Sequence, residues 1–330
     1  MLPPPEAVDG PSASFQDRKT GLVIFGILTA LLGVLCALIV PLMFFGQQMA
    51  AKAGTPQSMQ MIAPAILMYG GLAVVLVWLG IGSAMARRWA RALLLIFSWS
   101  WLLMGVVGIG MMAFMLPHIM ETAHAAAPPG QPPLPESAAT IATVVMMVLS
   151  GVIFVLLPAA WLLFYRSPHV KATCEAYDPV VRWTDRCPLP VIALCLWLAF
   201  SAPMMLLMAV AYKGVMPVFG VFVTGLAGSA LYVLIALFWS YAAWALYKLD
   251  RRGWWLVAVT MCLFSLSAFI TYSRHDISEL YVLMGYPAEQ IAQIQKFGVF
   301  KGQTMAWMTL VGFAPFLGYL LYVRKYFVRS

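Results

Sequence analysis

"TGLVIFGILTALLGVLCALIVPLMFFG" runs from Thr20 to Gly46 and contains 27 residues without a charged side chain. A helix needs about 20 mostly apolar residues to cross a hydrocarbon core about 30 Å thick. Every backbone polar group inside lipid must also be paired within such a segment, and a helix pairs them all. This stretch therefore predicts a transmembrane helix.

Seven further stretches meet the same criterion, so the sequence predicts an all-α integral membrane protein with eight transmembrane helices. The expected spans are 20–46, 61–85, 92–117, 138–165, 190–212, 221–247, 254–273 and 304–327. The composition agrees, since 63% of the residues are hydrophobic and 10% are charged. The net charge of +8 does not indicate nucleic acid as a partner, because the cations lie in short gaps between apolar runs rather than on a solvated face.

The basic residues divide unevenly between the two sides of the predicted bundle. With eight spans both termini lie on one side, and that side holds 15 of the 20 Lys and Arg residues. Because positively charged loops are retained in the cytoplasm, we expect both termini to be cytoplasmic. Residues 1–17 lack the basic start and the cleavage site of a signal peptide, and we expect them to form a disordered cytoplasmic tail.

The predicted spans form two sets of four. We expect a first four-helix half over 18–165 and a second over 190–330, joined by a charged cytoplasmic connector over 166–189. The fourth span of each half contains a proline, Pro158 or Pro315, with a tyrosine seven residues later. This layout raises a parallel duplication as a hypothesis, but aligning the ends of the two halves gives no more identity than chance.

Charged side chains, which are scarce in the spans, are concentrated in the connector. Five of the 14 residues from Cys174 to Cys187 are charged. His169, Cys174 and Cys187 could supply three zinc ligands, with a carboxylate as the fourth. Against zinc, the two cysteines are 13 positions apart, whereas structural zinc sites bring their ligands in close pairs. A disulfide is disfavoured in the reducing cytoplasm. Arg186 beside Cys187 would favour a thiolate, and so a redox or regulatory thiol.

A structural connector is the alternative to a metal or thiol site. Turns, ion pairs and interfacial anchoring would fix its path along the membrane surface. Asp185 with Pro188 would also cap the start of the fifth span. The residues expected to hold the connector in this way are Asp178, Arg182, Trp183, Asp185 and Arg186.

"TCEAYDPVVRWTDRCPLPV", from Thr173 to Val191, resembles a segment of uncharacterised multi-pass membrane proteins of bacteria. The resemblance covers about 20 of the 330 residues. It implies a bacterial inner membrane and brings no activity and no functional residue.

Two loops on the outer side carry further signals. Pro287 can start a helix, with Glu289 in its first turn and Ile291, Ile294 and Phe297 near one face. This pattern predicts a short helix on the outer surface, or a packed loop. At the start of the second span, Thr55-Pro56 offers a cap and a first-turn proline.

The spans contain few groups that could do chemistry. All 12 acidic residues fall in tails, loops or span ends, which counts against an ion-coupled transporter or pump because such proteins keep charges inside the membrane. The leading interpretation is a non-catalytic scaffold or accessory subunit of a membrane complex, without a cofactor, whose partners are the lipid bilayer and other membrane subunits. One alternative is a carrier of a small apolar or lipid-like molecule. The other is a zinc- or thiol-based site in the loop 166–190.

Overall fold

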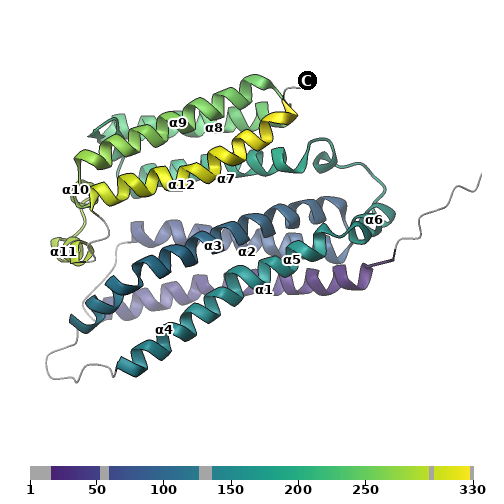
Figure 1. Cartoon of the computed structure of the whole chain (residues 1–330), viewed down its shortest axis with the longest axis horizontal. Coiled ribbons are helices and arrows are strands. Elements are labelled where there is room, and N and C mark those ends of the chain that lie inside the picture. Colours follow the sequence, from purple (N-terminus) through teal and green to yellow (C-terminus); the bar gives the residue numbers. More distant parts are fainter. Residues whose placement is uncertain (1–15, 53–58, 126–135, 297–300, 328–330) are drawn as a thin grey trace, which may run out of the picture.

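The chain folds into an elongated bundle with two layers of helices, as seen in a computed structural model (Figure 1). The structure describes residues 16–52, 59–125, 136–296 and 301–327. Within these ranges eight helices are long and apolar enough to cross a membrane. The expected fold class is therefore confirmed, and the chain is a multi-pass membrane protein.

The first layer contains the four spans expected for the first half. Its elements are α1 (Lys19–Lys52), α2 (Met59–Ala84), α3 (Arg88–Ala125), α4 (Glu136–Gly151), η1 (Val152–Leu156) and α5 (Leu157–Arg166). The last three form one continuous span, in which η1 is a π-helical stretch directly before Pro158. Proline has no N–H to donate and its ring clashes with the preceding turn, and a π-turn is one way to relieve this inside a helix.

The second layer contains the other four spans, and short elements join the layers and the helices. The remaining elements are α6 (Pro168–Tyr177), η2 (Trp183–Asp185), α7 (Leu189–Ala211), β1 (Met216–Val218), β2 (Val221–Val223), α8 (Gly225–Tyr247), α9 (Arg251–Arg274), α10 (Ile277–Leu283), α11 (Ala288–Lys296), α12 (Gly302–Val323) and η3 (Arg324–Tyr326). In the first layer α1 packs on α2 and α3 on α5, and in the second α7 packs on α8 and α9 on α12. The same pairing thus occurs in both layers, while the duplication stays a prediction.

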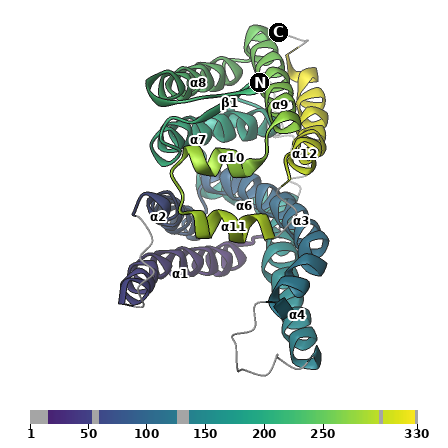
Figure 2. The ribbon, with the colours of Figure 1, turned by 90° about the vertical axis from the view of Figure 1, so that its left-hand side faces the viewer.

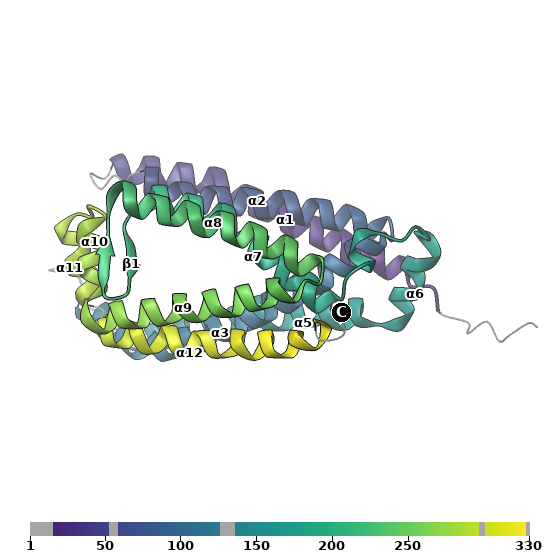
Figure 3. The ribbon, with the colours of Figure 1, turned by 90° about the horizontal axis from the view of Figure 1, so that it is seen from above.

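A short β-hairpin replaces the expected start of the sixth span. The span was expected from residue 221, but β1 and β2 pair antiparallel in the register Met216 with Val223, and α8 begins only at Gly225. Phe219 and Gly220 between the strands have φ of 42° and 93°, as in the type I′ turns that match the twist of a hairpin. Figure 3 shows the hairpin crossing from the α7–α8 pair to the α9–α12 pair.

The helix predicted after Pro287 is present as α11, and a further helix, α10, precedes it. Figure 2 looks onto this end of the bundle and shows α10 across the second layer and α11 closer to the first. We call this the outer end, and the opposite end, which carries α6, the inner end. Phe297 and the expected cap at Thr55-Pro56 lie outside the described residues.

Buried apolar side chains are concentrated toward the inner end. One cluster there joins residues of α1, α2, α3, α5 and α6, and another joins the inner parts of α7, α8, α9 and α12 with Cys187 of the connector and Ile96 of α3. Farther out, none of the residues from Trp307 to Tyr319 of α12 is buried. The span Thr140–Arg166 has no buried residue in its most apolar 18-residue window. Such exposure is compatible with lipid, whose tails are as apolar as the side chains.

Glycines allow α1 and α2 to approach closely. A Cβ atom at Gly80 would lie 2.6 Å from the carbonyl oxygen of Gly26, and a Cβ atom at Gly26 would lie 2.6 Å from that of Gly80. Both distances are shorter than atoms tolerate, so even alanine would force the helices apart. Small residues at such contacts are typical of helix pairs in membranes.

We predict that Gly80→Ala lowers the free energy of unfolding by about 1–3 kcal/mol, the usual cost of overpacking. The matched control is Gly71→Ala on the same helix, where an added Cβ meets no atom within 4 Å. That variant should be neutral or gain up to about 1 kcal/mol from helix propensity. Unfolding in detergent, followed by circular dichroism, measures both, and equal effects would contradict the close contact.

Candidate functional site

The connector folds back onto the turn between α2 and α3. Asp178, just after α6, has a side chain that is 2% exposed and lies between cations. Its Oδ1 is 2.9 Å from Arg182 Nη2 and 3.8 Å from Arg87 Nη1. Its Oδ2 accepts the backbone N–H of Arg88 at 3.4 Å. One buried carboxylate therefore links the connector to the first layer.

Arg88 makes the second link. Its Nη2 lies 3.3 Å from Glu175 Oε1 and its Nε lies 3.6 Å from Asp185 Oδ2. Asp185 also accepts the backbone N–H of Arg182 at 2.9 Å. We name this group of charged side chains the inner clamp. It consists of Arg87, Arg88, Glu175, Asp178, Arg182 and Asp185.

The electrostatics of the inner clamp keep Asp178 charged. Burial by itself raises the pKa of this carboxyl group. The hydrogen bond from the Arg182 side chain, the N–H of Arg88 and the nearby positive charges outweigh burial, so the pKa of Asp178 lies below its usual value. The hydrogen bond to Asp178 in turn raises the pKa of Arg182. The ion pair is therefore intact at neutral pH.

Each cysteine of the connector is buried in a different layer. Cys174 is 1% exposed and belongs to the first-layer cluster that contains Tyr165 and Trp161. Cys187 is 5% exposed and belongs to the second-layer cluster that contains Trp254. The connector thus inserts one side chain into the core of each layer.

The residues expected to bind zinc do not form a ligand set. Over the described part of the chain, no group of three or more His, Cys, Asp or Glu side chains is placed to hold a metal ion. The Nδ1 atom of His169 accepts the backbone N–H of Gln16 at 3.3 Å. Cys174 and Cys187 are both free thiols, not a disulfide.

The expectation that Arg186 favours a thiolate at Cys187 is wrong. Burial raises the pKa of Cys187 to about 11. Burial also raises the pKa of Cys174 to about 11, against the opposing charge of Arg91. Burial is the largest cause for both thiols and the only one at Cys187, so both thiols are protonated at neutral pH.

One other expected role in the connector also differs. Asp185 does not cap α7, because its carboxylate is directed to Arg88 and Arg182, and α7 starts after Pro188 without a side-chain cap. Trp183 is 41% exposed, and its carbonyl accepts the hydroxyl of Tyr247 at 3.2 Å. The connector is therefore attached to the end of α8 as well as to the first layer.

Arg87 and Arg88 are the residues of the inner clamp that the sequence reasoning missed. In the sequence they are two of the 15 Lys and Arg residues that predict the orientation. The available signal was the three carboxylates of the connector, Glu175, Asp178 and Asp185, on the same side of the membrane as the basic turn. Oppositely charged side chains in loops on the same side of the membrane can approach one another and form ion pairs.

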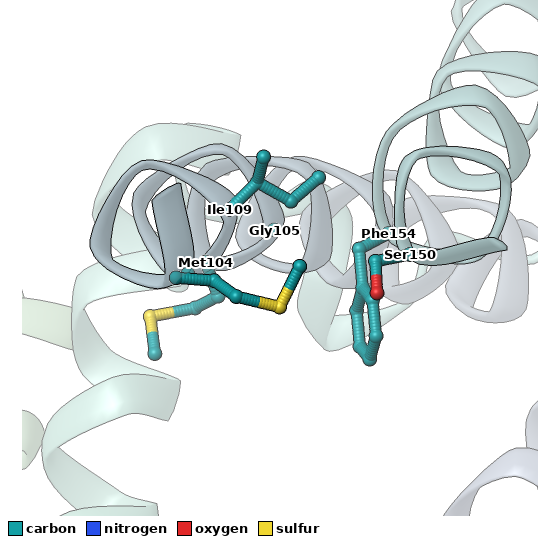
Figure 4. A pocket seen from close by; sticks show the side chains of 7 residues that line it. Met104, Gly105, Ile109, Ser150 and Phe154 are labelled. Atoms are coloured by element: carbon teal, nitrogen blue, oxygen red, sulfur yellow. The ribbon is translucent and has the colours of Figure 1, made fainter. Parts of the chain in front are cut away.

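An apolar cavity of about 220 Å³ that is open to the surroundings lies between α3 and the α4–η1 segment, and its lining residues Met104 and Phe154 are 58% and 44% exposed. Figure 4 shows Met104 and Ile109 on α3 and Ser150 and Phe154 on the facing helix. The helices approach closely at its edge, because a Cβ atom at Gly105 would collide with the carbonyl oxygen of Phe154. The lining residues are Met104, Gly105, Gly108, Ile109, Met112, Ser150 and Phe154.

Comparison of the chain with family models, with curated proteins and with solved structures finds no match. Function must therefore be inferred from the inner clamp, the cavity and the exposed surface of the spans.

We predict that Asp178→Asn lowers the free energy of unfolding at pH 7 by about 1.5–3 kcal/mol, the contribution of hydrogen bonds to a charged group. Because the pKa of Asp178 is lowered in the folded state, its contribution is present above the unfolded-state value and is lost as pH falls through the folded-state value. The difference between wild type and variant should therefore vanish in acid. Denaturant unfolding at several pH values measures it.

Lys171→Gln is the matched control for this prediction. Lys171 is 59% exposed and lies 3.8 Å from Glu175. An exposed pair of this kind contributes less than about 1 kcal/mol. If both variants change the stability equally, the buried position of Asp178 has no special importance.

Proposed function

We propose that the protein is a non-catalytic scaffold or accessory subunit of a complex in the bacterial inner membrane, with both termini in the cytoplasm. The observation that supports this most is the span Thr140–Arg166, which has no buried residue in its most apolar window. The part of this span before Pro158 is thus presented to whatever surrounds the protein, while Trp161, Leu162 and Tyr165 near its inner end are buried.

The charged groups at the inner end support a structural role. Every carboxylate of the connector has a cationic partner, and these pairs join the connector to the α2–α3 turn. The charged group that suggested a metal or thiol site in the sequence is thus engaged in fastening the connector to the first layer. The orientation follows from the 15 to 5 division of Lys and Arg. Figure 1 agrees with a shared side for the termini, since α1 begins and α12 ends at the end that carries α6.

The exposed surface of the fourth span is suited to another transmembrane helix. Val148 is 60% exposed and Leu156 63% exposed, and a Cβ atom at Gly151 would meet no atom within 4 Å. Helices in lipid associate by close packing around small residues, not by the hydrophobic effect. A glycine flanked by branched side chains offers such a surface, and we infer that it binds a helix of a partner subunit.

We predict that the protein extracted in a mild detergent runs as a complex on native gels, and that Val148→Trp releases the partner. The bulky ring would separate two packed helices, which corresponds to a loss of affinity of at least about tenfold. Leu237→Trp is the control, because Leu237 on α8 is 64% exposed to the surroundings. Recovery of wild-type protein without any partner would overturn the proposal.

The cavity favours a second candidate, a carrier of a small apolar or lipid-like molecule. The cavity is lined by apolar side chains with the hydroxyl of Ser150 among them. Ligand sites commonly combine apolar walls with a few polar groups.

For this second candidate we predict that lipid remains bound to the purified protein and that Gly108→Leu displaces it by filling the cavity. A Cβ atom at Gly108 meets no atom within 4 Å, so the larger side chain fits into open space. Gly312→Leu on α12 is equally open and lies away from the cavity. Native mass spectrometry should show fewer bound lipids for the first variant only, and equal occupancy in both would exclude the cavity as the site.

A further inference from the structure

The hairpin between α7 and α8 is fastened to α9 at the outer end. The backbone N–H of Phe219 donates to Ser267 Oγ at 2.9 Å, and that of Gly220 donates to Thr271 Oγ1 at 2.9 Å. These bonds hold a turn in which a phenylalanine has a positive φ, a conformation that bulky residues avoid unless their surroundings impose it. The hairpin therefore joins the α7–α8 pair to the α9–α12 pair, as Figure 3 shows.

A histidine makes a third bond to the same turn. The Nε2 atom of His275 lies 3.1 Å from the carbonyl oxygen of Gly220, and its Nδ1 atom lies 2.7 Å from Glu279 Oε2. The ring also lies 5.3 Å from that of Phe222. His275 directly follows α9 and Glu279 lies in α10, so one imidazole connects the hairpin, α9 and α10.

The chemistry of the two partners determines the protonation state that this geometry needs. A carbonyl oxygen and a carboxylate accept hydrogen bonds and donate none. A neutral imidazole has a single N–H and can serve only one of them, whereas the imidazolium has two. When the proton is lost, the bond to the charged carboxylate is the stronger one and is retained. The lone pair on Nε2 then faces the Gly220 oxygen, and two acceptors cannot form a hydrogen bond.

We propose that His275 is a proton-operated latch, whose imidazolium holds the hairpin turn against α9 and whose neutral form releases it. Ser267 and Thr271 cannot replace this bond, because they bind the N–H groups of the turn and not its carbonyl.

The charges around His275 are consistent with a latch near neutral pH. The hydrogen bond to Glu279 raises the pKa of His275 above its ordinary 6.5, and the Gly220 carbonyl adds to this against desolvation and the charge of Arg274. A raised pKa means that the stabilisation is complete at low pH and is lost as pH rises through the folded-state value. The turn should therefore be released above pH 6.5.

Among the described residues, the other charged groups near the latch are few. Arg274 lies against the turn, since a Cβ atom at Gly220 would be 2.9 Å from its Nη1. Asp276 accepts the N–H of Gly302 at 2.6 Å. On the side of α12, Lys301 is exposed. The strands themselves, residues 216–223, contain no titratable side chain. His275 is thus the group at this turn whose charge changes between pH 5 and 8.

Hydrogen exchange of the full chain in lipid nanodiscs, read by mass spectrometry as protection factors, tests the latch. Dividing by the intrinsic rate removes the chemical effect of pH. Between pH 5.5 and 8.5 we expect protection of the peptide over 216–223 to fall about tenfold, the equivalent of one charge-assisted hydrogen bond. Constant protection across this range would overturn the proposal.

Three variants separate a latch from a merely structural histidine. His275→Gln should abolish the pH step, because glutamine does not titrate. Glu279→Gln should move the step to lower pH, because the neutral amide no longer favours the imidazolium; this readout remains even if the first variant fails to fold. His169→Gln at the inner end is the matched control and should leave the step unchanged. A step that persists in His275→Gln, or that Glu279→Gln does not move, would contradict the latch.

Discussion

In lipid, an apolar side chain gains little by being buried against another helix, and this constraint explains where the protein is held together. The contacts that hold it are those that lipid cannot replace. They are close backbone approaches, as between Gly26 and Gly80, and polar groups paired out of water, as around Asp178. The long exposed surfaces of α4 and α12 are a consequence of the same constraint and not a defect of packing.

These contacts differ between the two ends of the bundle. At the inner end the connector contributes ion pairs to the first layer and Cys187 to the core of the second. At the outer end a separate buried cluster and the hydrogen bonds of the hairpin and of Asp276 close the second layer. The buried residues of that cluster are Val215, Ile277, Leu280 and Met284. Each end is therefore held by its own kind of contact, ion pairs with the connector at one end and a small apolar core beside the hairpin at the other.

The spans could be predicted from the sequence, because a transmembrane helix is recognised by its length and apolar composition alone, as in Thr20–Gly46. It failed at Val221, where an apolar run that could continue a helix forms a strand, because a two-residue turn at Phe219 and Gly220 decides the outcome. In the connector Asp178, Arg182 and Asp185 form ion pairs as expected, but their partners Arg87 and Arg88 were not predicted. Ion pairs between residues about 90 positions apart depend on how the helices pack, which the composition of the sequence does not specify.

The same separation has a consequence for biogenesis. Membrane proteins are made from the N-terminus onward, so the α2–α3 turn is in place while Glu175 and Asp178 are still unsynthesised. The first four spans then carry Arg87 and Arg88 at the membrane surface without their carboxylates. The first layer is completed only when α6 has left the ribosome and docked, with the N–H of Arg18 bound to Thr173. A chain that ends before residue 175 would thus lack the carboxylates that pair with Arg87 and Arg88, and its first layer would remain unfastened at this end.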